Sequence, residues 1–261
     1  MKPAFFGHSS RPLYGVHEPP RPGSPRRAAV LLSYPGVQEY NMAHWAFRRL
    51  SGMLAREGFH VLRFDWSGSG DSWGETSDGT LNGWIEDAAL AMSELRDVSG
   101  RDAAAIVGMR LGAAITAVAC GRGLAVDQLV LWEPVVRGRD YIVELETLDE
   151  RENARLLHPM RAMRTELVGF PFSQKLRDDL GTIDLSLFPP KNAKKVSIIA
   201  HSERSDHLAL HESILQAGGA ASYACVPEDP SATNAGKREE ALLTTRALVA
   251  IVDTLLGKAL S

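Results

Sequence analysis

The chain has 261 residues and a formal net charge of -3. Hydrophobic residues make up 44% of it and charged residues 23%, a composition typical of a globular rather than a disordered chain. Because the chain has no excess of Lys and Arg to neutralise phosphates, nucleic acid is not expected as a main partner. Its two cysteines are too few for a disulfide framework, and we expect both Cys120 and Cys225 to be small core residues.

No targeting signal is expected. The first residues, Met1-Lys-Pro-Ala-Phe-Phe-Gly, lack the apolar run of a signal peptide. No stretch approaches roughly 18 uninterrupted apolar residues, so we expect no membrane span. These features predict a soluble cytoplasmic protein. No His and acid pair shows ligand spacing on one element, so neither a metal nor another cofactor is predicted, and nothing in the sequence specifies an oligomeric state.

Short apolar strands alternate with amphipathic helices along the chain. The predicted strands are Leu13–Val16, Ala28–Ser33, Phe59–Phe64, Ala103–Val107, Leu129–Trp132, Lys195–Ala200 and Ala220–Val226. The predicted helices are Ala43–Glu57, Leu81–Val98, Leu111–Arg122, Asp206–Ala217 and Arg238–Leu256. This order predicts an α/β fold in which a mostly parallel sheet is covered by helices on both faces.

Residues 139–187 interrupt this alternation. The segment is charged, mostly helical in its spacing and without a convincing strand. We interpret it as a helical lid inserted into a single domain of residues 1–261, not as a second domain. Its apolar residues at helical spacing, together with the exposed-looking apolar segment Leu167–Phe172, favour a lid over a hydrophobic pocket. Ordinary core packing of the insertion is the alternative.

Three motifs occur in an informative order. Ser33–Val37 follows an early strand, and Asp65–Gly74 contains Asp followed by Gly-x-Gly-x-Ser. The third, Gly108-Met109-Arg110-Leu111-Gly112, matches the strand-to-helix turn in which G-x-S-x-G presents a nucleophile. With these motifs the chain resembles the α/β-hydrolase superfamily, in the layout of its serine-aminopeptidase-like and lysophospholipase-like branch. The resemblance implies an α/β-hydrolase fold over nearly the whole chain.

The resemblance also implies an oxyanion hole. In the superfamily, one backbone N–H comes from the loop after the early strand, and another from the residue after the nucleophile. Here these donors would belong to Gly36 or Val37 and to Leu111. The loop Asp65–Gly74 is expected to be mainly structural.

Two members of the expected Ser-His-acid triad are missing from their places. Arg110 stands at the nucleophile position, and a guanidinium stays protonated and has no lone pair to offer. The His should follow the strand Ala220–Val226, but no His occurs from Glu212 to Ser261. Asp206 or Glu203, which follow the strand Lys195–Ala200, could be a relic of the acid, and Glu133 is another acid at a strand end. Hydrolysis by the usual triad is therefore not predicted.

An Arg at this turn has two interpretations. The turn opens a helix whose first N–H groups carry partial positive charge, so Arg110 would add a planar fork suited to carboxylate or phosphate. Alternatively, Arg110 pairs internally with Glu133, Asp65, Asp206 or Glu39 and fills the vacated pocket. Both interpretations require a nearby acid, because an unpaired buried charge is very unfavourable.

Glu39 and His44 are further candidates. They flank Asn41 in the loop that leads into the first large helix. With Arg110 they would form a non-standard polar cluster, in which His44 carries protons near neutral pH. The alternative is that His44 is a surface or capping residue.

Three functional hypotheses follow. In the first, the chain is a pseudoenzyme of the hydrolase fold that binds a small amphipathic anionic or acyl ligand, with Arg110 holding the anion and Glu133 beside it under the lid. In the second, it is an active acyl hydrolase, transferase or lyase that uses Arg110, a general acid or base such as His44, Glu39 or Asp206, and the oxyanion-hole N–H groups. In the third, it is an interaction module with a vestigial pocket.

Overall fold

The computed structural model describes residues 1–24, 27–154, 166–227 and 245–258. The strands of its main sheet are β1 (Lys2–His8), β2 (Arg11–Glu18), β3 (Ala29–Ser33), β4 (His60–Phe64), β5 (Ala104–Met109), β6 (Val126–Trp132), β9 (Ala193–Ala200) and β10 (Ala220–Cys225). The helices are α1 (Tyr40–Arg56), α2 (Leu81–Ser99), α3 (Arg110–Gly121), α4 (Gly138–Asn153), α5 (Gln174–Gly181), α6 (Ser205–Gln216) and α8 (Thr245–Leu255).

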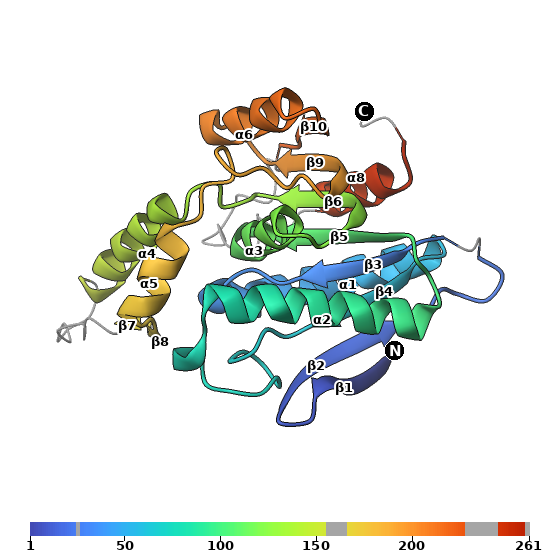
Figure 1. Cartoon of the computed structure of the whole chain (residues 1–261), viewed down its shortest axis with the longest axis horizontal. Helices are drawn as coiled ribbons and strands as arrows, with labels where there is room; N and C mark the ends of the chain where they lie inside the picture. Colours follow the sequence, from blue (N-terminus) through green and yellow to red (C-terminus); the bar gives the residue numbers. More distant parts are fainter. Residues whose placement is uncertain (25–26, 155–165, 228–244, 259–261) are drawn as a thin grey trace.

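The eight strands form one sheet in the order β1-β2-β4-β3-β5-β6-β9-β10 (Figure 1). From β4 to β10 every neighbouring pair is parallel. At the other end, β1 pairs with β2 and β2 pairs with β4 in antiparallel fashion. The predicted mostly parallel α/β sheet is therefore confirmed. Of the predicted helix Arg238–Leu256, residues before Thr245 lie outside the described ones.

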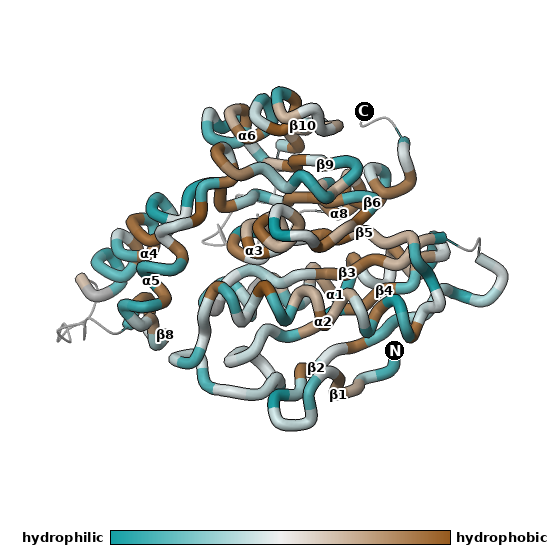
Figure 2. Tube along the Cα trace, viewed as in Figure 1, coloured by the Kyte–Doolittle hydropathy of each residue, from teal (hydrophilic) through white to brown (hydrophobic). Residues whose placement is uncertain are grey.

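Both faces of the sheet are buried. Along β3, Val30 and Leu32 pack with α1 and α8, whereas Leu31 packs in the opposite layer with α2, α3 and α6. This arrangement explains why the parallel strands consist of unbroken apolar runs rather than alternating ones. Figure 2 shows the same distribution, with hydrophobic residues along the central strands and more hydrophilic residues on the outer helix surfaces.

The sequence pattern identified only part of the first hairpin. The strand Leu13–Val16 is longer than predicted, and its partner β1 was not predicted. Six of the seven β1 residues are exposed, so the strand lacks the alternation that marks a half-buried strand. A second difference concerns Cys225, which is exposed because β10 is the edge strand, whereas Cys120 is buried as expected.

Residues 138–181 form the insertion segment, which contains α4, the short strands β7 (Glu166–Leu167) and β8 (Phe170–Pro171), and α5. It leaves and rejoins the main body at an isolated bridge between Arg137 and Asp184. Leu167 and Phe172 were expected to be exposed but are buried, because they join the hydrophobic core beneath α4 and α5. Core packing therefore accounts for much of the apolar content of this segment.

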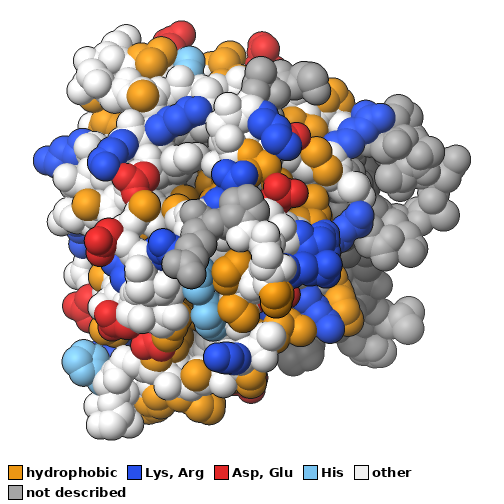
Figure 3. All heavy atoms as spheres, turned by 90° about the vertical axis from the view of Figure 1, so that its right-hand side faces the viewer, with side chains coloured by type: hydrophobic (Ala, Val, Ile, Leu, Met, Phe, Trp, Pro, Cys, Tyr) orange, Lys and Arg blue, Asp and Glu red, His pale blue; other side chains and the backbone are white. Residues whose placement is uncertain are grey.

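Charged side chains of both signs lie on one face of the molecule (Figure 3). Figure 3 looks onto the right-hand side of Figure 1 and shows Lys and Arg side chains interspersed with acidic and hydrophobic ones. None of the helices within the described ranges combines the length and apolar composition that a membrane crossing requires.

Two histidines on neighbouring strands, His17 and His60, lead us to expect that the stability of the protein depends on pH. His17 Nε2 lies 3.2 Å from His60 Nδ1, and the rings stack with centroids 5.4 Å apart. Burial, and then the adjacent His60, lower the pKa of His17 to about 4. Because the folded-state pKa of His17 is lowered, neutral His17 contributes fully to protein stability above the unfolded pKa of about 6.5. This contribution declines as the pH falls toward 4.

We therefore expect His17→Asn to lose less stability than the wild type between about pH 7 and pH 4.5. Urea denaturation at both pH values measures the difference. His8→Asn, on the exposed β1 strand, is the control. An unchanged pH profile in His17→Asn contradicts the assignment.

Candidate functional site

The turn between β5 and α3 has the sharp geometry that its sequence predicts. Arg110 is the first residue of α3 and has a φ of 50°, in the left-handed region that non-glycine residues rarely adopt. A Cβ on Gly108 would lie 2.6 Å from Ala113 Cα, and one on Gly112 would lie 2.0 Å from the Tyr34 carbonyl oxygen. The two glycines therefore allow the backbone segments on either side of Arg110 to approach closely.

Two carboxylates hold the Arg110 side chain. Its Nε donates to Glu39 Oε1 at 2.9 Å, and its Nη2 donates to Glu144 Oε1 at 2.5 Å. The guanidinium also lies over the Tyr141 ring, 5.6 Å from its centroid. Of the predicted partners, Glu39 is confirmed, and Glu144 on α4 is a partner that the sequence pattern did not indicate. We name Arg110, Glu39 and Glu144 the arginine cluster.

The arginine cluster carries a formal charge of -1 when all three groups are ionised. Burial acts to lower the pKa of Arg110, but attraction to Glu39 and Glu144 outweighs it and raises that pKa. Burial raises the pKa of Glu39, and Arg110 opposes this effect. The two carboxylates differ in exposure: the Glu39 side chain is 15% exposed and the Glu144 side chain 55%. Glu144 is therefore the partner more readily replaced.

Tyr141 occupies the region where the oxyanion donors were predicted. Its hydroxyl would lie 2.7 Å from a Cβ on Gly36, and Leu111 Cδ2 would lie 3.2 Å from the same point. Gln38 Nε2 donates to the hydroxyl at 2.9 Å. Val37 begins the short 3-10 helix η1 (Val37–Glu39) that brings Glu39 to Arg110. Gly36, Val37 and Leu111 thus lie near the arginine cluster, with the Tyr141 side chain packed against Gly36 and Leu111.

Glu133 pairs with a histidine rather than with Arg110. It directly follows β6, is 3% exposed and has a left-handed φ of 46°. Its Oε1 lies 2.6 Å from His201 Nδ1 and also accepts the His201 backbone N–H. Sequence analysis did not select His201, because it lies in the loop before the expected histidine position. A buried acid that orients an imidazole through Nδ1 is an arrangement used for general bases.

Asp206 is also separate from the arginine cluster. Its oxygens accept from Arg204 Nε at 3.1 Å and Nη2 at 2.9 Å, and Oδ1 accepts the backbone N–H of His207. The pKa of Asp206 is lowered because these hydrogen bonds and charges outweigh the opposing effect of burial. Asp206 therefore helps to begin α6 and does not pair with Arg110.

His44 does not join Arg110 either. It lines a different cavity, of about 400 Å³, together with Tyr34, Tyr40, Arg63 and Asp65. Burial is the main cause of a lowered pKa of His44, with Arg63 adding to it. The predicted cluster of Glu39, His44 and Arg110 is thus divided between two places, because Glu39 ends a 3-10 helix whereas His44 lies further along α1.

The loop after β4 has the structural role expected of it. Ser72 Oγ donates to the Asp65 carbonyl at 2.6 Å and accepts the Tyr14 backbone N–H at 2.8 Å. Asp65 Oδ1 accepts from the Tyr40 hydroxyl at 2.7 Å. The loop thereby connects β4 to β2 and to the start of α1.

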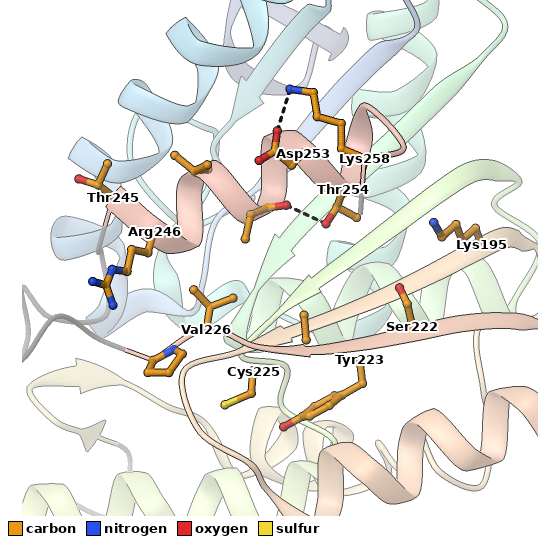
Figure 4. A pocket seen from close by; sticks show the side chains of 14 residues that line it. Lys195, Ser222, Tyr223, Cys225, Val226, Thr245, Arg246, Asp253, Thr254 and Lys258 are labelled. Carbon is orange, nitrogen blue, oxygen red and sulfur yellow. Dashed lines mark hydrogen bonds and ion pairs between the residues drawn. The ribbon is translucent and has the colours of Figure 1, made fainter. Parts of the chain in front are cut away.

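Two sizeable cavities in the described part of the chain do not include the arginine cluster. One, of about 830 Å³, lies between β10 and α8, and its lining includes Ser222 and Ala224 on β10 and Arg246 and Thr254 on α8 (Figure 4). Another, of about 580 Å³, lies between the end of α3 and residues 182–191, which follow α5. Within the described ranges, no group of three or more His, Cys, Asp or Glu side chains is placed to hold a metal ion.

The sheet order and the strand–turn–helix at Arg110 define an α/β-hydrolase fold. The chain belongs to the serine aminopeptidase S33 family, whose family model matches residues 25–206. No curated protein matches the chain.

Solved structures with low sequence identity share the fold. Est1E from Butyrivibrio proteoclasticus with bound ferulic acid is 14% identical, with a TM-score of 0.67 over 97% of this chain and 96% of that chain. Proline iminopeptidase from Mycobacterium smegmatis is 12% identical, with a TM-score of 0.66 over 98% of each chain. Alpha/beta hydrolase domain-containing protein 10 from mouse is 15% identical, with a TM-score of 0.59 over 98% of each chain.

Proposed function

We propose that this member of the serine aminopeptidase S33 family does not use a covalent serine and instead binds a small amphipathic anion at Arg110. The observation that carries the proposal is that Arg110 occupies the apex of the nucleophile turn and is held there by two carboxylates. A guanidinium attracts carboxylate or phosphate but cannot attack an acyl group. The sequence after Glu212 also contains no histidine that could act as the usual base.

The ligand would compete with Glu144 for Arg110. Glu39 is buried and approaches Nε, whereas Glu144 is half exposed and contacts only Nη2. A ligand carboxylate that displaced Glu144 would recover the same charge-assisted hydrogen bond. It would also return the Glu144 carboxylate to water. The insertion segment would then act as a lid over the ligand, since Glu144 lies on α4, whose Tyr141 and Leu145 are buried in the core beside it.

Removing the internal competitor should therefore strengthen binding. We expect Glu144→Gln to bind ferulate or octanoate about tenfold more tightly than the wild type, since one charge-assisted hydrogen bond corresponds to about 1.5 kcal/mol or more. Isothermal titration calorimetry measures the affinity. Ferulate is chosen because it is the acid bound by the structurally similar Est1E.

Glu146→Gln is the matched control, since Glu146 lies on the same helix and pairs with Arg177 instead. Its affinity should equal that of the wild type. Equal affinities in Glu144→Gln and Glu146→Gln would contradict an anion site at Arg110. If neither acid binds any of these proteins, the third hypothesis, an interaction module, is favoured.

The absence of a serine nucleophile gives a separate expected outcome. A fluorophosphonate probe should leave the purified protein unlabelled, and Arg110→Ser should remain unlabelled too, because His201 belongs to a different loop from the usual base. Gel fluorescence and intact mass spectrometry measure labelling. Stoichiometric labelling of the wild type at any serine would contradict the proposal.

The Glu133–His201 pair favours a second function, an acyl hydrolase, transferase or lyase with a non-standard site. The His201 side chain is 40% exposed, and its Nδ1 is oriented by a buried carboxylate, so Nε2 can take a proton from water. Turnover of p-nitrophenyl esters that is lost in His201→Ala but retained in Glu144→Gln would establish this function. Turnover that is unaffected by His201→Ala would exclude His201 as the base.

A further inference from the structure

A second buried arginine lies outside the arginine cluster, in the cavity of about 400 Å³ that also receives His44. Arg63 is on β4 and is 5% exposed. The walls around it come from β2, from the end of β3 and from the start of α1, and they include Val16, Tyr34 and Tyr40. The volume lies within the range of small-molecule pockets, roughly 300–1,000 Å³.

Arg63 has no acidic partner among the described residues. Its Nη1 donates to the Tyr34 hydroxyl at 3.1 Å, and its Nη2 contacts Met1 Sδ at 3.7 Å, a weak acceptor. Its Nε is buried without a hydrogen-bond partner. A guanidinium carries five N–H donors, so most of those of Arg63 are unused. Arg110, by contrast, has two carboxylates.

One acid on the cavity wall, Asp65, is already engaged. Asp65 Oδ1 accepts from the Tyr40 hydroxyl at 2.7 Å, and Oδ2 accepts the Asp71 backbone N–H at 3.1 Å. Both oxygens of Asp65 thus hold the loop after β4 in place. A buried cation without a counter-charge is unfavourable unless something else supplies one. The cavity beside Arg63 is where such a group would fit.

We infer that Arg63 is a binding site for a small oxyanion, a carboxylate or a phosphate monoester, attached to a flat ring. The oxyanion would accept from the unused N–H groups of Arg63 in the forked geometry that guanidinium favours. The ring would lie against the aromatic wall formed by Tyr34, Tyr40 and His44, whose rings lie 4.9 to 6.2 Å apart between centroids. This site is separate from the proposed ligand site at Arg110.

Val16 provides a sharp test of this inference. It is the register partner of Arg63 across the antiparallel pair of β2 and β4, and it lines the cavity. Directly opposed residues on such strands have their side chains on the same face, about 5 Å apart at Cβ. A carboxylate introduced by Val16→Glu would therefore pair with Arg63 internally. Val16→Gln has the same shape without the charge and is the matched control.

The probes are benzoate, phenyl phosphate and inorganic phosphate, titrated by calorimetry. We expect the wild type and Val16→Gln to bind benzoate or phenyl phosphate, and Val16→Glu and Arg63→Met to bind at least about tenfold more weakly. Comparison of the two aromatic probes distinguishes carboxylate from phosphate. Weaker binding of inorganic phosphate than of phenyl phosphate would support the contribution of the aromatic wall.

A second readout covers the case in which Arg63→Met fails to fold. Without ligand, Val16→Glu should have a higher Tm than Val16→Gln, because it supplies the missing counter-charge. In the Glu144→Gln background, Val16→Glu should still bind these probes more weakly than Val16→Gln, which separates this site from the arginine cluster. Equal affinity in Val16→Glu and Val16→Gln, or no binding of any probe by the wild type, would overturn the inference.

Discussion

Gly112→Ala is expected to lower the free energy of unfolding by about 3 kcal/mol or more. This value lies at the upper end of the range for substitutions that overpack a protein core. An added Cβ would lie 2.0 Å from the Tyr34 carbonyl oxygen and 2.8 Å from Ser33 Oγ. The first of these atoms belongs to the backbone, so it cannot rotate away. The strand β3 and helix α3 would have to separate, and Ser33 Oγ would lose its hydrogen bond to the Gly112 carbonyl.

Gly121→Ala is the control for this prediction, since Gly121 ends the same helix and an added Cβ would meet only the Pro189 carbonyl oxygen, at 3.7 Å. It should be neutral or slightly stabilising, because alanine has the higher helix propensity. Urea denaturation of both variants measures the difference. If both variants unfold at the same urea concentration, then close approach at Gly112 does not determine the stability of this turn.

Arg110→Met is expected to lower the free energy of unfolding by about 3–5 kcal/mol at neutral pH, as in other buried ion pairs that lose one partner. The reason is Glu39, whose buried carboxylate would lose the cation that opposes the rise of its pKa. In this variant the folded-state pKa of Glu39 lies further above its unfolded value. The contribution of Glu39 to stability is then fully present below the unfolded pKa and is lost as the pH rises. The destabilisation should therefore be smaller at about pH 4.5 than at pH 7.5.

The double variant Arg110→Met/Glu39→Gln should recover most of this loss, because it removes the uncompensated charge. Lys194→Met is the control, since Lys194 forms an exposed ion pair with Asp127 and such pairs contribute about 1 kcal/mol or less. Denaturation of the variants at both pH values provides the test. A loss in Arg110→Met that is independent of pH, and that Glu39→Gln does not reduce, would show that Glu39 is not the group responsible.

The two proposed ligand sites differ in whether their buried arginine already has an acidic partner. Arg110 is already paired, so a ligand must displace Glu144 before it binds. Arg63 has no acidic partner among the described residues, so a ligand needs to displace nothing charged. The Glu144 and Val16 variants act on different ligand sites, and the outcomes of the two sets of titrations are independent.

The alternation of strands and helices could be predicted from the amino-acid sequence alone, because apolar periodicity reflects which faces a segment must bury. The turn at Arg110 could also be predicted, because Gly108 and Gly112 match the glycine spacing of the strand-to-helix turn. The close approach of the Tyr34 carbonyl to Gly112 became evident only in the fold. The absence of a histidine after Glu212 was likewise visible without a structure. That residues 1–261 form one domain, and that the insertion segment acts as a lid, stay predictions.

Which charged groups meet became evident only in the three-dimensional fold. Glu39 and Glu144 lie 71 and 34 positions from Arg110, and Glu133 lies 68 positions from His201. Local patterns report backbone conformation and burial within one element, whereas these pairs depend on how η1, α4 and the strand ends are placed against each other. For the same reason the sequence could not indicate that Arg63 lacks an acidic partner among the described residues. That depends on how β2, β4 and α1 enclose one cavity.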